Sequence, residues 1–194
     1  MTKSLKLFLG ISYITILFVF LYVIFSYVEL NRLDDFLYYK ELQIFLEQMV
    51  GKNLYFNLII FFLFSLVWVS LLGFGSPLLL ISGILFGKWI GTFISVLSIS
   101  VGSLVLYSLA SFFFKDLVYK ILEKRFLKYI HLFRKNEFNY FLAFRLAGGL
   151  GIPFGLQNIL PVLFNIKKFN YFFASFLGFI PVFFIWNTIG SGLN

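Results

Sequence analysis

The sequence predicts an all-α polytopic membrane protein, in which two opposed re-entrant helical hairpins and transmembrane helices form an inverted repeat. Three observations predict this class. The chain of 194 residues is 61% apolar and only 12% charged, with a mean hydropathy of +0.96, whereas soluble domains are about half apolar and a quarter charged. Its apolar segments are long enough to span a bilayer. Two of these segments are interrupted by breaks rich in glycine and proline.

The first element is an uninterrupted apolar run over residues 7–28, which is preceded by Lys3 and Lys6. About 20 apolar residues cross a bilayer, and the run lacks the small-residue cleavage site that ends a secretory signal peptide. We therefore expect residues 1–28 to form a retained signal-anchor transmembrane helix.

Two polar segments predict the orientation of the chain. Residues 29–53 carry five acidic side chains against three basic ones, whereas residues 115–137 carry seven basic side chains against three acidic ones. Positively charged loops stay in the cytoplasm. We therefore expect a multi-pass protein of the cell membrane with its N-terminus and residues 115–137 in the cytoplasm, and with 29–53 as an external polar segment.

The apolar segments between these loops predict a first hairpin. If residues 54–90 and 91–113 were both simple spans, the chain could not return to the cytoplasm by residue 115. The first of them contains the break GFGSP at residues 73–77. A re-entrant hairpin over 54–90, followed by a span over 91–113, resolves the conflict.

The second half of the chain repeats this arrangement from the other side. Residues 138–166 contain a glycine-rich and proline-rich break and end at a pair of lysines, so we expect a hairpin that enters from the cytoplasm. Residues 169–189 then cross outward. Inverted repeats with broken helices are the architecture of many transporters. The alternative is five or six plain spans with proline kinks.

Glycine permits turns and close approach of two backbones, and proline removes a helical hydrogen bond. Small residues at a spacing of three or four also let membrane helices pack closely. On these grounds, the residues predicted to shape the hairpins are Pro77, Gly83, Gly87, Pro153, Pro161 and Pro181.

Arg145 is a fixed positive charge inside an apolar segment. Such a charge costs several kcal/mol in hydrocarbon unless it finds partners or water. No apolar segment contains an Asp or Glu that could face it, so its candidate partners are hairpin carbonyls, water or an anionic ligand. A phosphate suits the geometry of the guanidinium group. The alternative is that Arg145 extends to the inner headgroups.

A predicted phosphate site surrounds this arginine. Glycine-rich turns can direct free N–H groups at an anion, and Asn158 stands in the second arm of the same hairpin. The predicted ligand-binding residues are therefore Arg145, Asn158, Gly149 and Gly151. The alternatives are that the glycines form a plain hairpin tip and that Gln157 and Asn158 only hydrogen-bond between helices.

Residues 115–137 have an apolar arc and a basic arc, which is typical of a helix lying on an anionic leaflet. The residues expected to contact the inner leaflet are Lys120, Lys124, Arg125 and Lys128. His131 stands alone and the chain has no Cys, so we expect no metal site and no cofactor. No hydrolytic or nucleotide-binding motif occurs, so we do not expect an enzyme.

Three segments resemble the DedA/SNARE-associated Golgi protein superfamily, whose common unit is the VTT domain, and within it the Tvp-type branch. They cover residues 76–109, 141–160 and 172–190. The residues that carry the resemblance are Pro77, Gly83, Phe86, Gly87, Phe144, Arg145, Pro153, Phe154, Asn158, Gly178, Pro181 and Gly190.

The resemblance implies a VTT-like membrane domain over residues 54–190 with two opposed re-entrant hairpins. It also implies lipid scrambling or the flipping of polyprenyl phosphates, and the hairpin arginine of the family corresponds to Arg145. Typical DedA members carry an acidic residue in the first hairpin arm. Here residues 57–77 contain no Asp or Glu, so we do not expect proton coupling through such a carboxylate.

The leading hypothesis is a scramblase-like or flippase-like protein that moves a phosphate-bearing lipid, a phospholipid or a polyprenyl phosphate, between leaflets. The expected partners are membrane lipids with anionic phosphate headgroups. We expect no binding of nucleic acid, and a homo-oligomer is compatible with the sequence. One alternative is a membrane assembly protein that docks partners through residues 115–137. Another is an ion or small-solute transporter.

Overall fold

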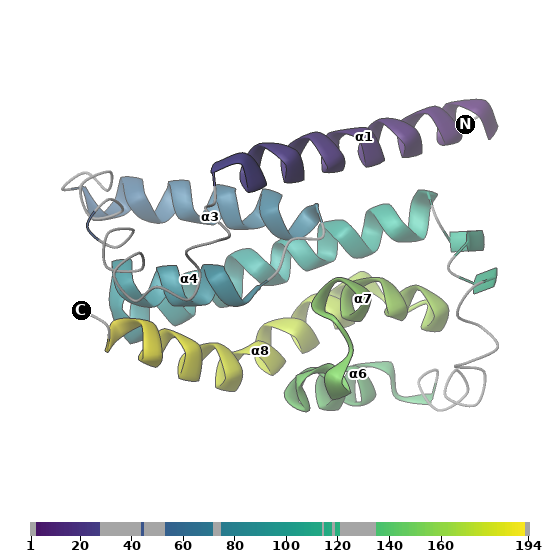
Figure 1. The fold of residues 1–194 in the computed structure, drawn as a ribbon. Helices are drawn as coiled ribbons and strands as arrows, with labels where there is room; N and C mark the ends of the chain where they lie inside the picture. Colours follow the sequence, from purple (N-terminus) through teal and green to yellow (C-terminus); the bar gives the residue numbers. More distant parts are fainter. Residues whose placement is uncertain are drawn as a thin grey trace. The chain divides into compact units, whose positions relative to one another are not determined.

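The computed structural model describes residues 3–27, 44, 53–71, 75–113, 115–117, 119–120 and 135–192 (Figure 1). Within these ranges the regular elements are helices, and none is a strand, which confirms the predicted all-α class. The chain divides into two compact units, Met1–Asn57 and Leu58–Asn194. Apart from residues 44 and 53, the predicted external segment 29–53 lies outside the described residues.

Helix α1 covers Lys3–Tyr27, close to the predicted range of 1–28. Its 25 residues extend for about 37 Å at 1.5 Å per residue. Helix α3 covers Leu54–Ser70. The side-chain oxygen of Asn53 accepts a 3.3 Å hydrogen bond from the backbone N–H of Phe56, which stabilises the start of α3 as N-cap residues do.

Helix α4, Ser76–Phe113, reverses its direction at Gly87. The side-chain oxygens of Ser82 and Ser95 lie 2.7 Å apart, although a straight helix would separate these residues by about 20 Å. Gly87 has φ 71° and ψ 175°, a conformation that glycine adopts readily and residues with a Cβ avoid. The predicted boundary between hairpin and span therefore falls at residue 87 rather than at residue 90.

The second half follows the same order of elements as the first. Helix α6, the 3₁₀ turn η2, helix α7 and the 3₁₀ helix η3 precede a reversal at Asn165, which has φ 52° and ψ 45°. The long helix α8 comes next. The bounds of these elements are Glu137–Leu146 for α6, Gly148–Gly151 for η2, Phe154–Ile159 for α7, Leu160–Phe164 for η3 and Lys168–Ser191 for α8.

The four prolines predicted to shape hairpins occupy different positions. Pro77 lies in the first turn of α4, Pro153 immediately precedes α7, and Pro161 lies at the start of η3. These are positions where the missing N–H of proline is tolerated. Pro181 differs from the prediction, because α8 continues through it as one helix. Proline removes a single hydrogen bond there, which does not end a helix of this length.

Helices α4 and α8 pack closely through small residues. A Cβ added at Gly83 would collide with the backbone of Asn187, and one added at Gly190 would collide with the backbone of Leu80. The Ser82 hydroxyl donates a 2.6 Å hydrogen bond to the side-chain oxygen of Asn187. Gly83 therefore permits helix packing and does not form a turn, unlike Gly87.

The two halves also contact each other near the second reversal. The hydroxyl of Tyr107, on α4, donates a 2.6 Å hydrogen bond to the backbone carbonyl of Ile166. The ring of Tyr107 stacks on that of Tyr171, with centroids 4.5 Å apart. This contact fixes the first turn of α8 against the long arm of α4.

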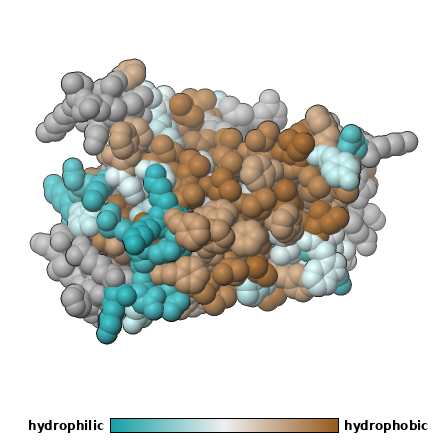
Figure 2. Space-filling view, turned by 180° about the vertical axis from the view of Figure 1, so that it is seen from behind, coloured by the Kyte–Doolittle hydropathy of each residue, from teal (hydrophilic) through white to brown (hydrophobic). Residues whose placement is uncertain are grey.

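Two helices within the described residues are long and apolar enough to cross a membrane, Pro77–Phe113 and Lys168–Ser191. The first of these is divided by the reversal at Gly87, and its part after Gly87 extends for about 39 Å, still more than the roughly 30 Å of a bilayer core. Figure 2 shows one face of the protein, on which apolar side chains form a broad surface. These features indicate a membrane protein.

Candidate functional site

The candidate site is built around Arg145, in the last turn of α6. Asn136 begins this helix by accepting a hydrogen bond from the backbone N–H of Asn139. The helix then places Arg145 against α8, with only 2% of its surface exposed. Gly178 of α8 makes this contact possible, because an added Cβ there would collide with the Cβ of Arg145.

Four neutral side chains accept hydrogen bonds from the guanidinium group. Nη2 donates to the side-chain oxygen of Asn158 at 2.7 Å and to the hydroxyl of Tyr171 at 2.9 Å. Nε donates to the hydroxyl of Ser175 at 3.2 Å, and Nη1 donates to the side-chain oxygen of Gln157 at 3.5 Å. The site therefore joins the end of α6, both amides of α7 and the first turns of α8.

Aromatic rings surround the same group. The guanidinium carbon lies 4.8 Å from the ring centroid of Phe141, 5.5 Å from that of Tyr171 and 4.7 Å from that of Phe179. A cation within about 6 Å of a ring face is attracted by the quadrupole of the ring, and more strongly when water is excluded. The three rings therefore stabilise the charge without neutralising it.

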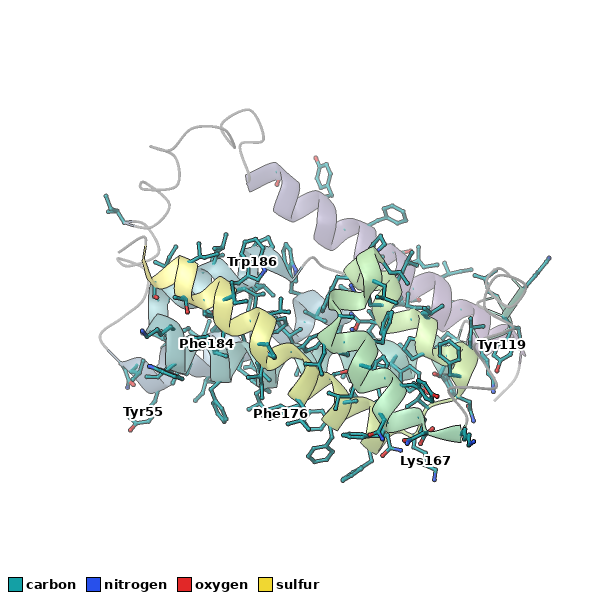
Figure 3. The ribbon with its side chains drawn as sticks, turned by 90° about the horizontal axis from the view of Figure 1, so that it is seen from below. Tyr55, Tyr119, Lys167, Phe176, Phe184 and Trp186 are labelled. Carbon is teal, nitrogen blue, oxygen red and sulfur yellow. The ribbon has the colours of Figure 1, made fainter. Side chains whose placement is uncertain are left out.

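The charge of Arg145 has no carboxylate partner among the described residues. Asp116 and Glu137 are the acidic residues that the described ranges contain. Glu137 instead accepts hydrogen bonds from the side chain of Asn170 and from the backbone N–H of Lys167. Lys167, which is labelled in Figure 3, immediately precedes α8. Arginine keeps its proton in proteins, so the site holds a net positive charge that only neutral groups surround.

One donor in this site has no acceptor. The side-chain nitrogen of Asn158 is buried and makes no hydrogen bond, while the oxygen of the same amide accepts from both Arg145 and Tyr171. A buried donor without a partner costs about 1–3 kcal/mol. An additional acceptor beside Asn158 would remove this cost, and a negatively charged acceptor would also meet the charge of Arg145.

Gln157 connects the arginine to the glycine turn. Its side-chain nitrogen donates to the carbonyl of Ile152 at 2.6 Å and to that of Gly148 at 3.3 Å. Gly149 has φ 70°, and an added Cβ would collide with the side chain of Gln157. The turn η2 thus closes over Gln157, and Gln157 in turn contacts Arg145.

The structure brings together three of the four predicted ligand-binding residues. Asn158 contacts Arg145 directly, and Gly149 contacts it through Gln157. Gly151 is exposed, and an added Cβ would have no neighbour within 4 Å. Gly151 shares the left-handed backbone of the turn, with φ 76°, but it makes no contact with the arginine.

The expected surroundings of Arg145 were incomplete in one respect. The candidates were hairpin carbonyls, water or a ligand, whereas the partners are side chains of α7 and α8. Tyr171 and Ser175, which the sequence analysis did not consider, lie one helical turn apart on α8 and so share a face. The spacing of Tyr171, Ser175 and Gly178 at about one helical turn was the sequence signal that could have identified this face of α8. Because Arg145 is buried, it does not extend to the headgroups in this structure.

The predicted inner-leaflet residues lie mostly outside the described residues, including Lys124, Arg125 and Lys128. Lys120 is described and exposed. The structure therefore leaves the predicted basic helix over 115–137 as a prediction. In the part of the chain that is described, no group of three or more His, Cys, Asp or Glu side chains is placed to hold a metal ion.

Comparison with known proteins identifies one family. Residues 73–192 match the family model described as the VTT domain, which is the domain of the DedA/SNARE-associated superfamily. The matched region contains Arg145, its hydrogen-bond partners on α7 and α8, and both backbone reversals. No solved structure matches the chain.

Proposed function

The chain belongs to the VTT domain family, and on this premise we propose that it moves a phosphate-bearing lipid between the two leaflets of the cell membrane. The substrate is a phospholipid or a polyprenyl phosphate, and transport is uncoupled scrambling. Arg145 engages the phosphate, and Asn158 supplies a further hydrogen bond.

The observation that carries this proposal is the pairing of Arg145 with Asn158. The guanidinium charge has only neutral partners, and the adjacent amide nitrogen has no acceptor. A phosphate oxygen supplies both missing elements, because it is negatively charged and accepts several hydrogen bonds. A neutral solute would provide an acceptor but no counter-charge, which favours the lipid phosphate.

The glycine turn η2 supports a mechanism in which the site opens. Arg145 is buried, so a headgroup reaches it only when the covering residues move. Gly148, Gly149, Leu150 and Gly151 all have positive φ values, between 55° and 76°. Glycine moves between such conformations at little steric cost. Movement of this turn would withdraw Gln157 from Arg145 and free the face on which the phosphate binds.

A polar centre beside the first reversal supports uncoupled transport. Ser82, Ser95 and Asn187 form a buried hydrogen-bonded group at the corresponding reversal. None of these side chains releases a proton near neutral pH. The site therefore offers no carboxylate through which a proton gradient could drive the movement of lipid.

The topology belongs to the same proposal. Two reversals at residues with positive φ, Gly87 and Asn165, separate short helices from the long helices that follow. This order supports two re-entrant hairpins, and the excess of basic residues over 115–137 supports their entry from opposite sides with the N-terminus in the cytoplasm. Irregular backbone such as η2 is tolerated at membrane depth where protein or water surrounds it.

Reconstitution tests the proposal. The full chain is placed in liposomes that contain fluorescent phosphatidylglycerol, and the labelled lipid that becomes accessible to an external quencher is followed over time. We expect scrambling by the wild type and its loss in Arg145→Met. Methionine has a similar length without the charge, but it also leaves the four side-chain oxygens that accept from Arg145 without this donor, so the unfolding midpoint of the variant is measured beside its transport. Loss of transport in a folded variant therefore shows that the guanidinium group is required.

Two further variants sharpen the result. Arg145→Lys keeps the charge but loses the planar group that binds phosphate through two hydrogen bonds, so we expect intermediate rates. Lys168→Gln removes an exposed charge at the start of α8 and serves as the control. Wild-type rates equal to those of empty liposomes would refute the proposal, and unchanged rates in Arg145→Met would remove Arg145 from it.

A further inference from the structure

Two hollows meet along one side of α6. The first has a volume of about 450 Å³ and lies between α6, the turn η2 and η3, within the size range of small-molecule sites. The second has a volume of about 480 Å³ and lies at the start of α6. Tyr140 and Ala143 form part of the wall of both, so the hollows adjoin and together form one groove.

The first hollow is apolar. The small side chains of Ala143, on α6, and of Ala147, the residue after α6, leave space beside the helix, and Leu150 of the turn lines the same hollow. Leu150 is 74% exposed, and its left-handed backbone, with φ 55°, costs about 1–2 kcal/mol for a residue other than glycine. The turn thus presents a large apolar side chain next to an apolar cavity.

The second hollow has polar side chains and one positive charge in its wall. Lys135, Asn136 and Asn139 line it, and all three are exposed. Among the described residues, the acidic residue closest to Lys135 in the sequence is Glu137, whose oxygens accept hydrogen bonds from Asn170 and from the backbone of Lys167. Glu137 does not line the hollow, so Lys135 is the charged residue in its described wall.

We propose that this groove binds one lipid, with an acyl chain in the apolar hollow and an anionic headgroup beside Lys135. The groove changes from cationic to apolar along the axis of α6, and an anionic lipid has the same order of headgroup and chain. The surrounding apolar surface indicates a membrane protein, so an acyl chain is the apolar group available to this cavity. The inference deepens the proposed function, on which it rests for the class of lipid.

The groove lies next to the candidate site. Phe141 lines the apolar hollow, and the same ring lies 4.8 Å from the guanidinium carbon of Arg145. One aromatic side chain therefore separates a bound acyl chain from the buried charge. A lipid held in the groove would place its headgroup at the start of α6 and its chain against the ring that covers Arg145. The groove is thus a waiting position before the phosphate reaches Arg145.

Photochemical labelling tests this proposal. The full-length protein is incorporated into phosphatidylcholine nanodiscs that contain phosphatidic acid with a diazirine on one acyl chain. After irradiation, the modified peptides are identified by mass spectrometry. We expect adducts to concentrate in residues 140–150 and 160–164. Ala143→Trp fills the apolar hollow from an exposed position, and because apolar binding scales with buried area, labelling there should fall about tenfold.

Leu177→Trp is the matched control, because it adds a tryptophan at an exposed position of α8 outside the groove. It should leave the adducts in place. Adducts spread evenly over the apolar surface, or adducts in the groove that persist in Ala143→Trp, would overturn the proposal. If an added protein or a peptide of this chain reduced the labelling of the groove and unlabelled phosphatidic acid did not, the groove would be assigned to a protein partner instead.

Lys135→Gln tests the headgroup end of the groove. Labelling is repeated with a diacylglycerol that carries the same diazirine chain but no phosphate. The wild type should label more with phosphatidic acid, and the preference should disappear in Lys135→Gln. Equal labelling by both lipids in the wild type would overturn the headgroup assignment. A protein that labels in the groove but does not scramble lipids would refute the proposed function and leave this inference standing.

Discussion

Asn158 accepts a 2.7 Å hydrogen bond from Arg145 through its side-chain oxygen, while the nitrogen of the same amide is buried without a partner. This hydrogen bond fixes the position of the positive charge. Among the described residues the charge has no carboxylate partner, and the amide nitrogen has no acceptor. A structural ion pair would carry a carboxylate at this position, because a carboxylate brings a negative charge that a neutral amide lacks.

Asn158→Asp is therefore expected to inhibit transport. The new carboxylate would lie at hydrogen-bond distance from Nη2 of Arg145 and would neutralise the charge that the phosphate needs. Because the buried pair gains attraction but loses hydration, we expect little change in the thermal unfolding midpoint. The scrambling rate should fall about tenfold, since a competing pair worth 1.4 kcal/mol has this effect.

Asn165→Asp is the control for this prediction. It makes the same chemical change at an exposed position, and Asp also tolerates the left-handed backbone that Asn165 adopts. Its scrambling rate should match that of the wild type. Transport that is equally fast in Asn158→Asp and in the wild type would show that an uncompensated charge at Arg145 is not required.

Much of the fold could be predicted from the sequence, because lipid imposes simple constraints. Apolar length and the glycine-rich and proline-rich breaks led to helices close to the observed α3, α6 and α8. The reversal at Gly87 lies three residues before the predicted boundary between hairpin and span. Pro181 was assigned to hairpin formation because a proline pattern does not distinguish a break from an interior proline in a long helix.

The candidate site was predicted less completely, for a physical reason. Arg145 and Asn158 stand out in the sequence as polar residues inside apolar segments. Tyr171 and Ser175 do not, because both residue types are common in membrane helices, and their role depends on how α8 packs against α6. Their neutral side-chain oxygens lie 26 and 30 residues beyond Arg145 in the sequence, and no local pattern links them to the arginine.

Gly149 and Gly151 offer a matched pair of substitutions in the turn. Both have φ near 70°, so replacement by alanine imposes the same backbone cost of about 1–2 kcal/mol. Only the new Cβ at Gly149 would collide with Gln157. Thermal unfolding should therefore show a larger loss of stability in Gly149→Ala than in Gly151→Ala. Equal losses would mean that Gln157 does not support the turn.

Gly178→Ala tests the close approach of α6 and α8. The added methyl group would collide with the Cβ of Arg145, and overpacking of this kind costs about 1–3 kcal/mol. We expect a lower thermal unfolding midpoint and slower scrambling, because the arginine would move from its partners. Gly192→Ala, where the new Cβ would meet only ordinary contacts, should behave as the wild type. A Gly178→Ala protein of unchanged stability would contradict the observed packing.

The reversal of α4 at Gly87 can be tested by cross-linking. The chain has no native cysteine, so Ser82→Cys with Ser95→Cys introduces a single pair. The two serine oxygens lie 2.7 Å apart, which brings the positions close enough for a disulfide, whose Cβ atoms lie about 3.5–4.5 Å apart. Oxidation should yield an intramolecular disulfide, detected by mass spectrometry of the digested protein. The control pair combines Ser82→Cys with Phe93→Cys. Phe93 is 62% exposed, so its side chain is directed away from Ser82. A straight helix would hold both pairs more than about 15 Å apart, so failure of the first pair to cross-link would refute the reversal.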